Sequence, residues 1–388
     1  MSGRVLRIGV AGLSRGFDLT RPTLQADARV AVVAAADPRP EARAAFQAEF
    51  GAPAYPTAEA MFEDPDVEVV YIATPHETHA DLAVAAARQG KHILVEKPMA
   101  LSLADCARMR SAADAAGVSL VVGPSHGFDA PVAWAGDFIA SGVVGAPRMV
   151  TSVTFTDFIY RPRRPAELDT RQGGGVVFSQ AAHQVDVARR LVGDRVVAVR
   201  ATTGIWDPAR PTEGAYQAFL TFAGGASAAL TYSGYGRYDS NALMGGIGET
   251  GEAVDVDAYA AARSRLGAAP EAELKSSRAY GAAASAKGAP AGHEHFGFVL
   301  ASCERADVRP TARGVEIYSE TSRRTVDLPL GPAGRKRVID ELWTAVVKQA
   351  PVIHDGLWGA ENLAVCLAIL RASAEGREVE VDALESGE

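Results

Sequence analysis

The sequence predicts an α/β protein of two domains, with an N-terminal doubly wound parallel sheet and a C-terminal α/β domain built on a large, mostly antiparallel open sheet. Before about residue 125, short β-branched runs alternate with alanine-rich, helix-like stretches, which is typical of a parallel sheet covered on both faces. After residue 147 the runs are longer and fewer helices separate them. The length of 388 residues also exceeds one ordinary domain.

The first domain, predicted over residues 1–125, alternates between strand and helix patterns. Its β-branched runs have the length of buried strands, and its helix-like stretches end at glycine, a common residue at helix C-termini. We expect strands at 7–12, 30–37, 67–75, 92–98 and 120–126, and helices at 38–52, 78–91 and 103–118.

The second domain, predicted over residues 126–388, contains longer strands. Residues 258–292 within it are rich in Ala, Gly and Ser, which indicates a flexible helical insertion or a lid. Elsewhere we expect strands at 147–158, 195–206, 214–224 and 226–236, and helices at 175–193 and 360–376.

The composition is that of a globular protein and argues against several classes of partner. The chain is 48% hydrophobic and has a formal net charge of −8, so neither nucleic acid nor an anionic membrane is expected as a partner. We see no apolar run of membrane-spanning length and expect no signal peptide. Cys106, Cys303 and Cys366 are far apart, which argues against a disulfide framework or a metal site and fits a reducing cytoplasm.

The stretch RIGVAGLSRGF is a strand followed by a glycine turn that opens a helix. A dinucleotide-binding (Rossmann) fold needs G-x-G-x-x-G/A there, because the glycines allow the tight turn, the approach of the backbone to the pyrophosphate and close helix packing. Gly12 takes the first place, Ser14 the second and Phe17 the third, while Gly16 is one residue out of register. We expect this turn, Arg15 included, to bind the cofactor; a generic βα turn is the alternative.

The run VAVVAAAD ends in Asp37, roughly 20 residues after the turn, where an acid bonds the adenosine ribose of a dinucleotide. An acid at this place favours NAD, because it repels the 2′-phosphate of NADP. Arg39 weakens this preference, since it can neutralise that phosphate, so NADP stays possible. The alternative interpretation is that Asp37 caps the helix that follows.

The segment YIATPHETHA contains the end of a third predicted strand. In an open α/β sheet the ligand lies beyond the carboxyl ends of the strands. We therefore expect four residues of this segment at the cofactor edge: Thr74, Pro75, His76 and His79. For His79 the alternative is a solvent-facing position in the first turn of a helix.

The segment HILVEKPMA ends a buried strand with two charges and a proline. Glu96 and Lys97 point to opposite faces of the strand, and both are expected beside the cofactor. A lysine here can act as a general base if its pKa falls from ~10.4 to ~7, which needs about 4–5 kcal/mol of differential stabilisation. Burial and a positive nicotinamide ring both act in this direction. The alternative is a lysine that reaches out to solvent.

The sequence VEKPMA after YIATPHETHA resembles the glucose–fructose oxidoreductase, inositol dehydrogenase and MocA family, and the resemblance covers nearly the whole chain. It implies a Rossmann domain, a catalytic lysine at Lys97, and a C-terminal α/β domain that binds substrate and forms a homodimer or homotetramer. In GGGVVFSQAAHQVDVARRL, His183 matches the family histidine that binds substrate or relays its proton. Ser179 replaces an aspartate of many sugar-oxidising members and shares a helix face with His183. Asp186 either orients the His183 ring or is a surface acid.

Three arginines, Arg161, Arg163 and Arg164, lie beside Tyr160 and just before these glycines. Arginine donates two hydrogen bonds from one planar fork, which suits a carboxylate. A carboxylated substrate would explain the cluster, and a solvated turn is the alternative.

Several long stretches, among them RPRRPAELDTRQGGGVVFSQAAHQVD and HDGLWGAENLAVCLAIL, are similar to members of this family that oxidise the 4,5-cis-dihydrodiol of phthalate. The resemblance implies oxidation to 4,5-dihydroxyphthalate with NAD as the hydride acceptor and Lys97 as the base. It also implies that His126 and His183 hold or relay the diol protons.

Other functions stay open. A sugar or inositol dehydrogenase of the same fold would act on a neutral ring, and a hemiacetal from aromatic breakdown would suit the same arginines. A non-catalytic binding protein on a Rossmann scaffold is the alternative from another class. Ser179 and the arginines argue against a sugar or inositol dehydrogenase. The intact Glu-Lys-Pro motif and His183 argue against a non-catalytic binding protein.

Overall fold

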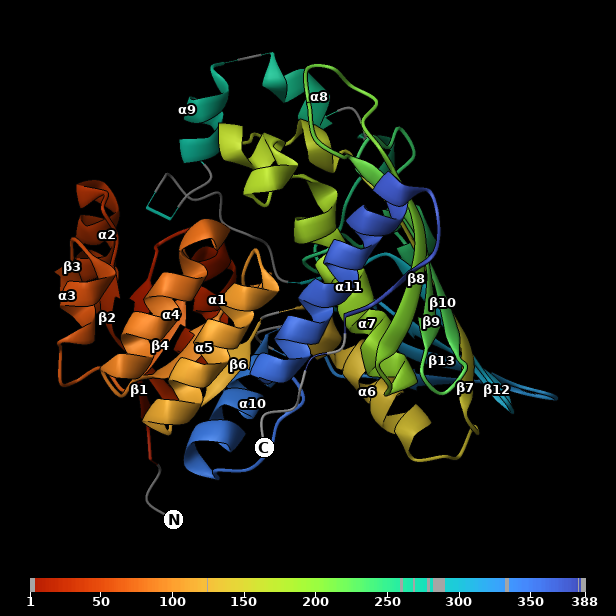
Figure 1. Ribbon diagram of the computed structural model, residues 1–388, viewed down its shortest axis with the longest axis horizontal. Coiled ribbons are helices and arrows are strands. Elements are labelled where there is room, and N and C mark those ends of the chain that lie inside the picture. Colours follow the sequence, from red (N-terminus) through yellow and green to blue (C-terminus); the bar gives the residue numbers. More distant parts are fainter. Residues whose placement is uncertain are drawn as a thin grey trace.

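The computed structural model describes residues 4–123, 125–258, 261–267, 269–277, 280–281, 290–331, 335–382 and 384. A six-stranded sheet and a nine-stranded sheet lie on opposite sides of the molecule, with helices between them (Figure 1). The predicted fold class, a doubly wound parallel sheet joined to a mostly antiparallel one, is confirmed.

The first sheet is entirely parallel, with the strand order β3-β2-β1-β4-β5-β6. In this order the direction of winding reverses between β1 and β4, so a ligand crevice is expected beyond the carboxyl ends of these strands. The strands are β1 Leu6–Ala11, β2 Val30–Ala36, β3 Ala54–Tyr55, β4 Val69–Ile72, β5 His92–Val95 and β6 Leu120–Val122.

Helices cover both faces of this sheet. One face packs against α1 Arg15–Ala26, α2 Pro40–Phe50 and α10 Lys336–Val347. The other packs against α3 Ala58–Phe62, α4 His79–Arg88 and α5 Leu103–Ala116. Because α10 comes from the far end of the chain, the C-terminal segment returns to the first sheet. The domain boundary near residue 125 stays a prediction.

The second sheet has the order β14-β13-β12-β11-β7-β10-β9-β8-β15. Its neighbouring strands are antiparallel except β7 and β10, which are parallel. The strands are β7 Pro147–Phe155, β8 Val196–Gly204, β9 Ala215–Phe222, β10 Ser227–Ser233, β11 Phe298–Cys303, β12 Ala306–Thr311, β13 Gly314–Ser319, β14 Arg323–Asp327 and β15 Val379–Glu380.

Three helices, α6 Ala130–Ala140, α7 Ala182–Val192 and α11 Gly356–Glu375, lie between the two sheets (Figure 1). By length and composition α11 is the one described helix that could cross a membrane, but 50% of its apolar window is buried inside the fold. It contributes Val365 and Ile369 to the core of the second sheet and Leu363 to a core of the first. It is therefore a core helix that joins the two halves.

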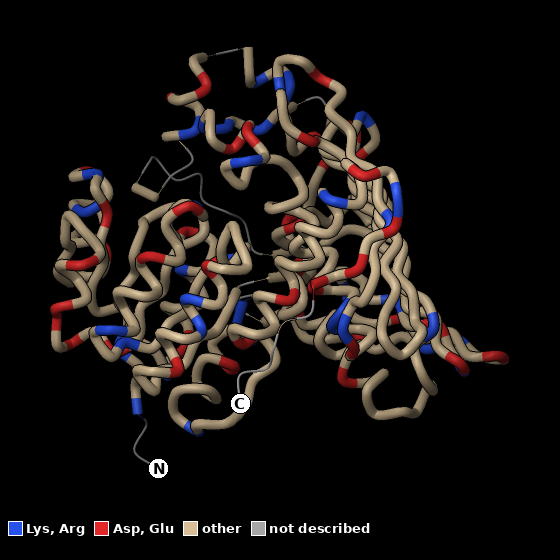
Figure 2. The backbone as a smooth tube through the Cα atoms, in the orientation of Figure 1, with Lys and Arg blue, Asp and Glu red and all other residues tan. Residues whose placement is uncertain are grey.

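Two short helices, α8 Ala261–Leu266 and α9 Glu271–Ser276, lie at the top of the view in Figure 1. Charges of both signs lie along this part of the chain and along the loops beneath it (Figure 2). The predicted insertion at 258–292 thus contains helices, as expected. Part of it lies outside the described residues.

Candidate active site

The glycine turn closes tightly on the end of β4. Gly12 has φ +89°, and a Cβ added to it would lie 2.9 Å from the Ala73 carbonyl oxygen, so only glycine fits without strain. Ser14 is the N-cap of α1; its hydroxyl accepts from the Gly16 amide at 3.2 Å and donates to the Ala73 carbonyl at 2.6 Å. The α1 N-terminus and Arg15, its first residue, thus face the crevice that a pyrophosphate needs.

Gly16, although out of register in the sequence, performs the packing role expected of the third glycine. A Cβ added to it would lie 2.8 Å from Oε1 of Glu96. Phe17, which takes the third place in the sequence, is fully buried in the core below α1 and α2. The departures from the motif therefore preserve the close approach of α1 to the sheet.

Asp37 lies at the carboxyl end of β2 with 5% of its surface exposed. Its carboxylate accepts from the Leu13 amide at 2.9 Å and from the Arg39 guanidinium at 2.9 Å. The N-cap of α2 is Arg39, so the alternative of Asp37 as the N-cap is wrong. The acid is instead held against the glycine turn, with one oxygen on Arg39 and the other shared by Leu13 and Arg39.

The residues after β4 form the neighbouring wall. Thr74 and His76 are half-buried and Pro75 is exposed. His79 is completely buried, with Nδ1 3.0 Å from the Pro98 carbonyl and Nε2 3.0 Å from the Thr74 carbonyl. The solvent-facing alternative for His79 is therefore wrong. Its ring ties the end of β4 to the loop after β5, and burial lowers its pKa.

Glu96 and Lys97 follow β5 and have separate partners. Glu96 accepts from the Tyr71 hydroxyl at 2.6 Å and lies 3.9 Å from Arg335. Lys97 donates from Nζ to the Ser179 carbonyl at 2.7 Å. Burial lowers the pKa of Lys97 to about 8, although the acids Glu96 and Glu249 oppose this shift. This value lies closer to physiological pH than that of a free lysine, so part of the amine is neutral there, as a general base requires.

His126 is a charged side chain within the site. Its Nδ1 lies 2.6 Å from Asp129, and its Nε2 lies 3.6 Å from Glu249. Burial alone would lower the pKa of His126, but the two acids outweigh burial and raise it to about 10. His126 is therefore a hydrogen-bond donor at neutral pH.

His183, at the start of α7, lies against His126 with ring centroids 4.6 Å apart. Its Nδ1 lies 3.1 Å from the Ser125 hydroxyl. Burial and the charges of Lys97 and His126 hold its pKa well below the usual range. The site thus contains one neutral and one charged histidine next to the lysine.

Ser179 lies in a π-helical turn, Val177–Ala181, and its hydroxyl donates to the Gly175 carbonyl at 2.5 Å. The helix face shared by Ser179 and His183 stays a prediction. The part of Ser179 that contacts Lys97 is its backbone carbonyl.

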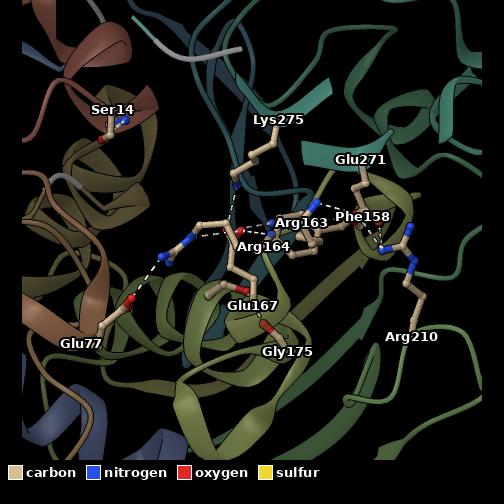
Figure 3. Close-up of polar contacts among 12 residues, drawn as sticks. Ser14, Glu77, Phe158, Arg163, Arg164, Glu167, Gly175, Arg210, Glu271 and Lys275 are labelled. Carbon is tan, nitrogen blue, oxygen red and sulfur yellow. Dashed lines mark hydrogen bonds and ion pairs between the residues drawn. The ribbon is translucent and has the colours of Figure 1, made fainter. Parts of the chain in front are cut away.

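The three arginines diverge in their charged partners, although Arg161 and Arg163 both lie over the Phe158 ring, at 5.3 Å and 3.7 Å from its centroid. Arg161 lies 3.8 Å from Glu249 and therefore belongs with Lys97 and His126. Arg163 stacks on Phe158 and donates to its carbonyl. Figure 3 shows Arg164 reaching the other way, to Glu77 at 3.0 Å.

The last two arginines instead hold the loops together. The Arg163 amide donates to Glu271 of α9, which also accepts from Arg210 at 2.7 Å, while Lys275 donates to Glu167 (Figure 3). Tyr160, also expected to bind substrate, lies under α8 with the Arg263 guanidinium 4.0 Å above its ring. These residues anchor α8 and α9.

Several site residues were not found from the sequence. Glu249 is one of two acids among the glycines of GGIGETGE, and Arg335 precedes α10, which was not predicted. Ser125 and Asp129 flank His126 in SHGFD, and no local pattern marks either of them as a site residue. Within the described residues, no group of three or more potential ligands could hold a metal ion.

The fold, the glycine turn and the buried lysine together define a dinucleotide-dependent oxidoreductase. A family model described as an oxidoreductase family with an NAD-binding Rossmann fold matches residues 6–124. The GFO/IDH/MocA C-terminal domain matches residues 132–254. The chain belongs to the GFO/IDH/MocA family, and NAD is its cofactor.

Similar proteins agree with this assignment. The chain is 44% identical to the 1-carboxy-3-chloro-3,4-dihydroxycyclohexa-1,5-diene dehydrogenase of Comamonas testosteroni, over 94% of both chains. It is 30% identical to the myo-inositol 2-dehydrogenase of Thermotoga maritima, over 49% of this chain and 56% of that one. A solved structure of a putative dehydrogenase from Bordetella bronchiseptica RB50 shares 39% identity with a TM-score of 0.92, covering 97% of this chain and all of the other. The prediction of an NAD-dependent dehydrogenase is confirmed.

Proposed function

We propose that the enzyme oxidises a carboxylated cyclohexadiene cis-diol to the corresponding catechol, with the 4,5-cis-dihydrodiol of phthalate as the substrate predicted from the sequence. The observation that carries this proposal is the place of Arg161. Its guanidinium lies in the same site as Lys97 and His126, where a substrate carboxylate can accept its paired hydrogen bonds. The similarity to an enzyme that acts on a carboxylated dihydroxycyclohexadiene supports the same class.

The residues at the carboxyl edge of the first sheet fit the cofactor. Gly12 leaves no room for a side chain between the turn and β4, and Asp37 offers a carboxylate at the end of β2. The turn and the first amides of α1 would hold the pyrophosphate, and Asp37 the ribose. NAD, when bound, supplies the acceptor for the hydride that leaves the diol carbon.

The side chains of the site carry out the proton transfer and hold the substrate in place. Neutral Lys97 takes the proton of the reacting hydroxyl group. The ring carbon that carries this group loses a hydride. His126, a cation, donates a hydrogen bond to a diol oxygen, and His183 contacts the other hydroxyl. The product ketone then tautomerises: the hydrogen on the second hydroxyl-bearing carbon leaves as a proton, and the carbonyl oxygen takes up a proton. The ring becomes aromatic, which makes the oxidation favourable. Arg161 binds the carboxylate of the substrate. This contact orients the substrate ring so that the reacting carbon faces the nicotinamide.

Three wider parts of the prediction belong to the same proposal. They are a role in the breakdown of phthalate or a related aromatic acid, a cytoplasmic location, and assembly into a homodimer or homotetramer through the second sheet. Exposed apolar side chains on strands of that sheet, Met149 on β7 and Phe219 on β9, support the assembly.

The test is NADH formation by the purified enzyme with three diols and one polyol in parallel. They are the cis-dihydrodiol of phthalate, its monocarboxylated counterpart, the unsubstituted benzene cis-dihydrodiol and myo-inositol. We expect turnover of one or both carboxylated diols, with kcat/KM at least about 100-fold above that of the benzene diol, because loss of the charged, paired hydrogen bonds between a half-buried guanidinium and a carboxylate costs about 3 kcal/mol. Preferred turnover of myo-inositol would overturn the proposal and favour the neutral-ring alternative.

A further inference from the structure

We propose that Glu249 limits the substrate site to a ring with one carboxylate, by placing a negative charge where a second carboxylate would lie. Glu249 is then a specificity-determining residue of the reaction. This inference rests on the proposed function. It makes the phthalate diol, the substrate predicted from the sequence, a poorer substrate than its monocarboxylated counterpart.

The guanidinium of Arg161 faces an acid at each of two edges. Its Nη1 lies 3.8 Å from Oε2 of Glu249, and its Nε lies 3.8 Å from Oδ1 of Asp157. Both distances are longer than a hydrogen bond, and within the described part of the chain this guanidinium makes no hydrogen bond. The Phe158 ring lies against it, with its centroid 5.3 Å from Cζ. Arg161 can therefore donate to a ligand carboxylate, but two of its edges already face negative charge.

The Glu249 carboxylate lies between Arg161 and His126. Its second oxygen, Oε1, is 3.6 Å from Nε2 of His126, the cation that is proposed to donate to a diol oxygen. Burial alone would raise the pKa of Glu249, but His126 and Arg161 outweigh burial and lower it. Glu249 is thus a charged group between the residue for the substrate carboxylate and the residue for the diol.

The turn that carries Glu249 is held by backbone hydrogen bonds. The Gly251 amide donates to the Gly248 carbonyl at 2.9 Å, and Gly251 has φ +82°, which favours glycine. The Glu249 carbonyl accepts from the His295 amide at 3.2 Å. Because its backbone is held in this way, Glu249 stays beside the two cations when a ligand binds.

The neighbouring arginines have partners of their own. Arg163 donates to the Phe158 carbonyl, and Arg164 pairs with Glu77 (Figure 3). Arg335 lies 3.9 Å from each of two acids. A second carboxylate would therefore reach the charged surroundings of the first without a guanidinium to receive it.

The two carboxylates of phthalate are on adjacent ring carbons. When one of them binds Arg161, the other lies directly beside it and therefore near Glu249 or Asp157, which flank the same guanidinium. Like charges placed side by side oppose binding strongly, and specificity often depends on such a repulsive group. A ring with a single carboxylate avoids this repulsion.

The test compares three aromatic ligands that share the two hydroxyl groups of the product. They are catechol with no carboxylate, 3,4-dihydroxybenzoate with one, and 4,5-dihydroxyphthalate with two. Because their rings are already aromatic, they bind without turnover, and calorimetric titration of the NADH-saturated enzyme gives a Kd for each. We expect the wild type to bind 3,4-dihydroxybenzoate at least about 10-fold more tightly than either of the others.

In Glu249→Gln the repulsion is smaller, so the Kd ratio of 4,5-dihydroxyphthalate to 3,4-dihydroxybenzoate should fall about 10-fold. This substitution also favours neutral Lys97, but that change weakens the binding of both anions and largely cancels in the ratio. Glu252→Gln is the matched control, because Glu252 is an exposed acid of the same loop and accepts from the Thr250 hydroxyl at 2.7 Å. It should leave the ratio unchanged.

Two results would overturn this inference and leave the proposed function in place. One is tighter binding of 4,5-dihydroxyphthalate than of 3,4-dihydroxybenzoate by the wild type, and the other is an equal Kd ratio in Glu249→Gln and Glu252→Gln. Catechol bound as tightly as both acids would overturn the proposed function and this inference with it, because Arg161 would then not bind a carboxylate.

Discussion

Lys97 is the side chain whose surroundings matter most for the rate. Its pKa is lowered to about 8, first by burial, so the fraction of neutral amine rises as pH rises through that value. We expect kcat/KM to increase up to about pH 8 and then level off. Lys97→Met should lower kcat at least about 1,000-fold and remove this pH dependence. A pH profile of NADH formation checks both outcomes.

A substitution of an acid next to Lys97 can show whether Lys97 causes the fall in kcat/KM at low pH, the acid limb of the profile. Lys97 is faced by Glu96, Glu249 and Arg335, and the two acids raise its pKa against burial. Removing one negative charge in Glu249→Gln should therefore move the limb to lower pH. A limb that stays in place in this variant would show that another group controls the rate.

Arg161 is expected to distinguish carboxylated from neutral substrates. Arg161→Gln should raise KM for a carboxylated diol about 100-fold, because it removes a charged bidentate donor, and should leave the benzene diol almost unaffected. Arg164→Gln is the matched control, since Arg164 is 40% exposed and pairs with Glu77 instead. Steady-state kinetics of both variants on both diols provide the measurement. Equal losses in the two variants would mean that the arginines act only through the loops.

Helix α1 shows how a departure from a sequence motif can be neutral in structure. The Ser14 hydroxyl caps α1 and bonds the Ala73 carbonyl, so it is occupied within the protein. Ser14→Gly should lower stability by only a few tenths of a kcal/mol and change the Kd for NAD less than about twofold. Gly12→Ala should weaken NAD binding at least about 10-fold, because the new Cβ would lie 2.9 Å from the Ala73 oxygen at a φ of +89°. Titration of NAD by fluorescence compares the two.

His354 joins three helices through one buried ion pair network. It follows α10, precedes α11, and lies 2.8 Å from Glu341 and 3.3 Å from Asp186 of α7. Burial opposes the charge, but these acids raise the pKa of His354 to about 9. A raised pKa stabilises the fold fully below the unfolded value of ~6.5 and loses that contribution as pH rises through about 9.

We therefore expect the stability advantage of the wild type over His354→Gln to shrink between about pH 6 and about pH 10, by on the order of 2–3 kcal/mol. Urea unfolding of both proteins at the two pH values measures it. His126 titrates in both proteins and so cancels in the comparison. An advantage that stays constant with pH would show that His354 is neutral in the folded state.

Five of the six strands of the first sheet were predictable, because each is a short apolar run between turn signals. The two-residue strands β3 and β15, the helices α3, α6 and α10, and the strands β11 to β14 were not predicted. Strands such as Arg323–Asp327 are largely exposed at an edge and carry no apolar alternation that marks a half-buried strand. The helix with the site histidine was found, but its π turn was not, because i→i+5 bonding leaves no periodic signal in sequence.

At the level of the complete chain, the site depends on contacts that no local pattern reveals. Lys97, His126, His183 and Arg161 were all expected to be functional, and the fold brings them together. Glu249 and Arg335 join them from segments more than 80 residues further along the chain than Arg161 or Lys97. Single acids and arginines are common on any surface, so only the fold distinguishes these from solvated charges. The clustering of the three arginines in sequence was misleading for the same reason.

The assembly of the chain is the last property that the structure makes testable. Phe219 on β9 is 47% exposed and Met149 on β7 is 48% exposed, and both strands belong to the sheet proposed as the interface. Obligate interfaces are apolar at their centre, so a charge there should prevent association. We expect the wild type to be dimeric or tetrameric by light scattering after gel filtration, and Phe219→Lys to be smaller. Val143→Lys is the control, because Val143 is 63% exposed in the turn after α6, before β7 begins. If Phe219→Lys keeps the wild-type mass while Val143→Lys loses it, the interface lies at that turn and not on the sheet.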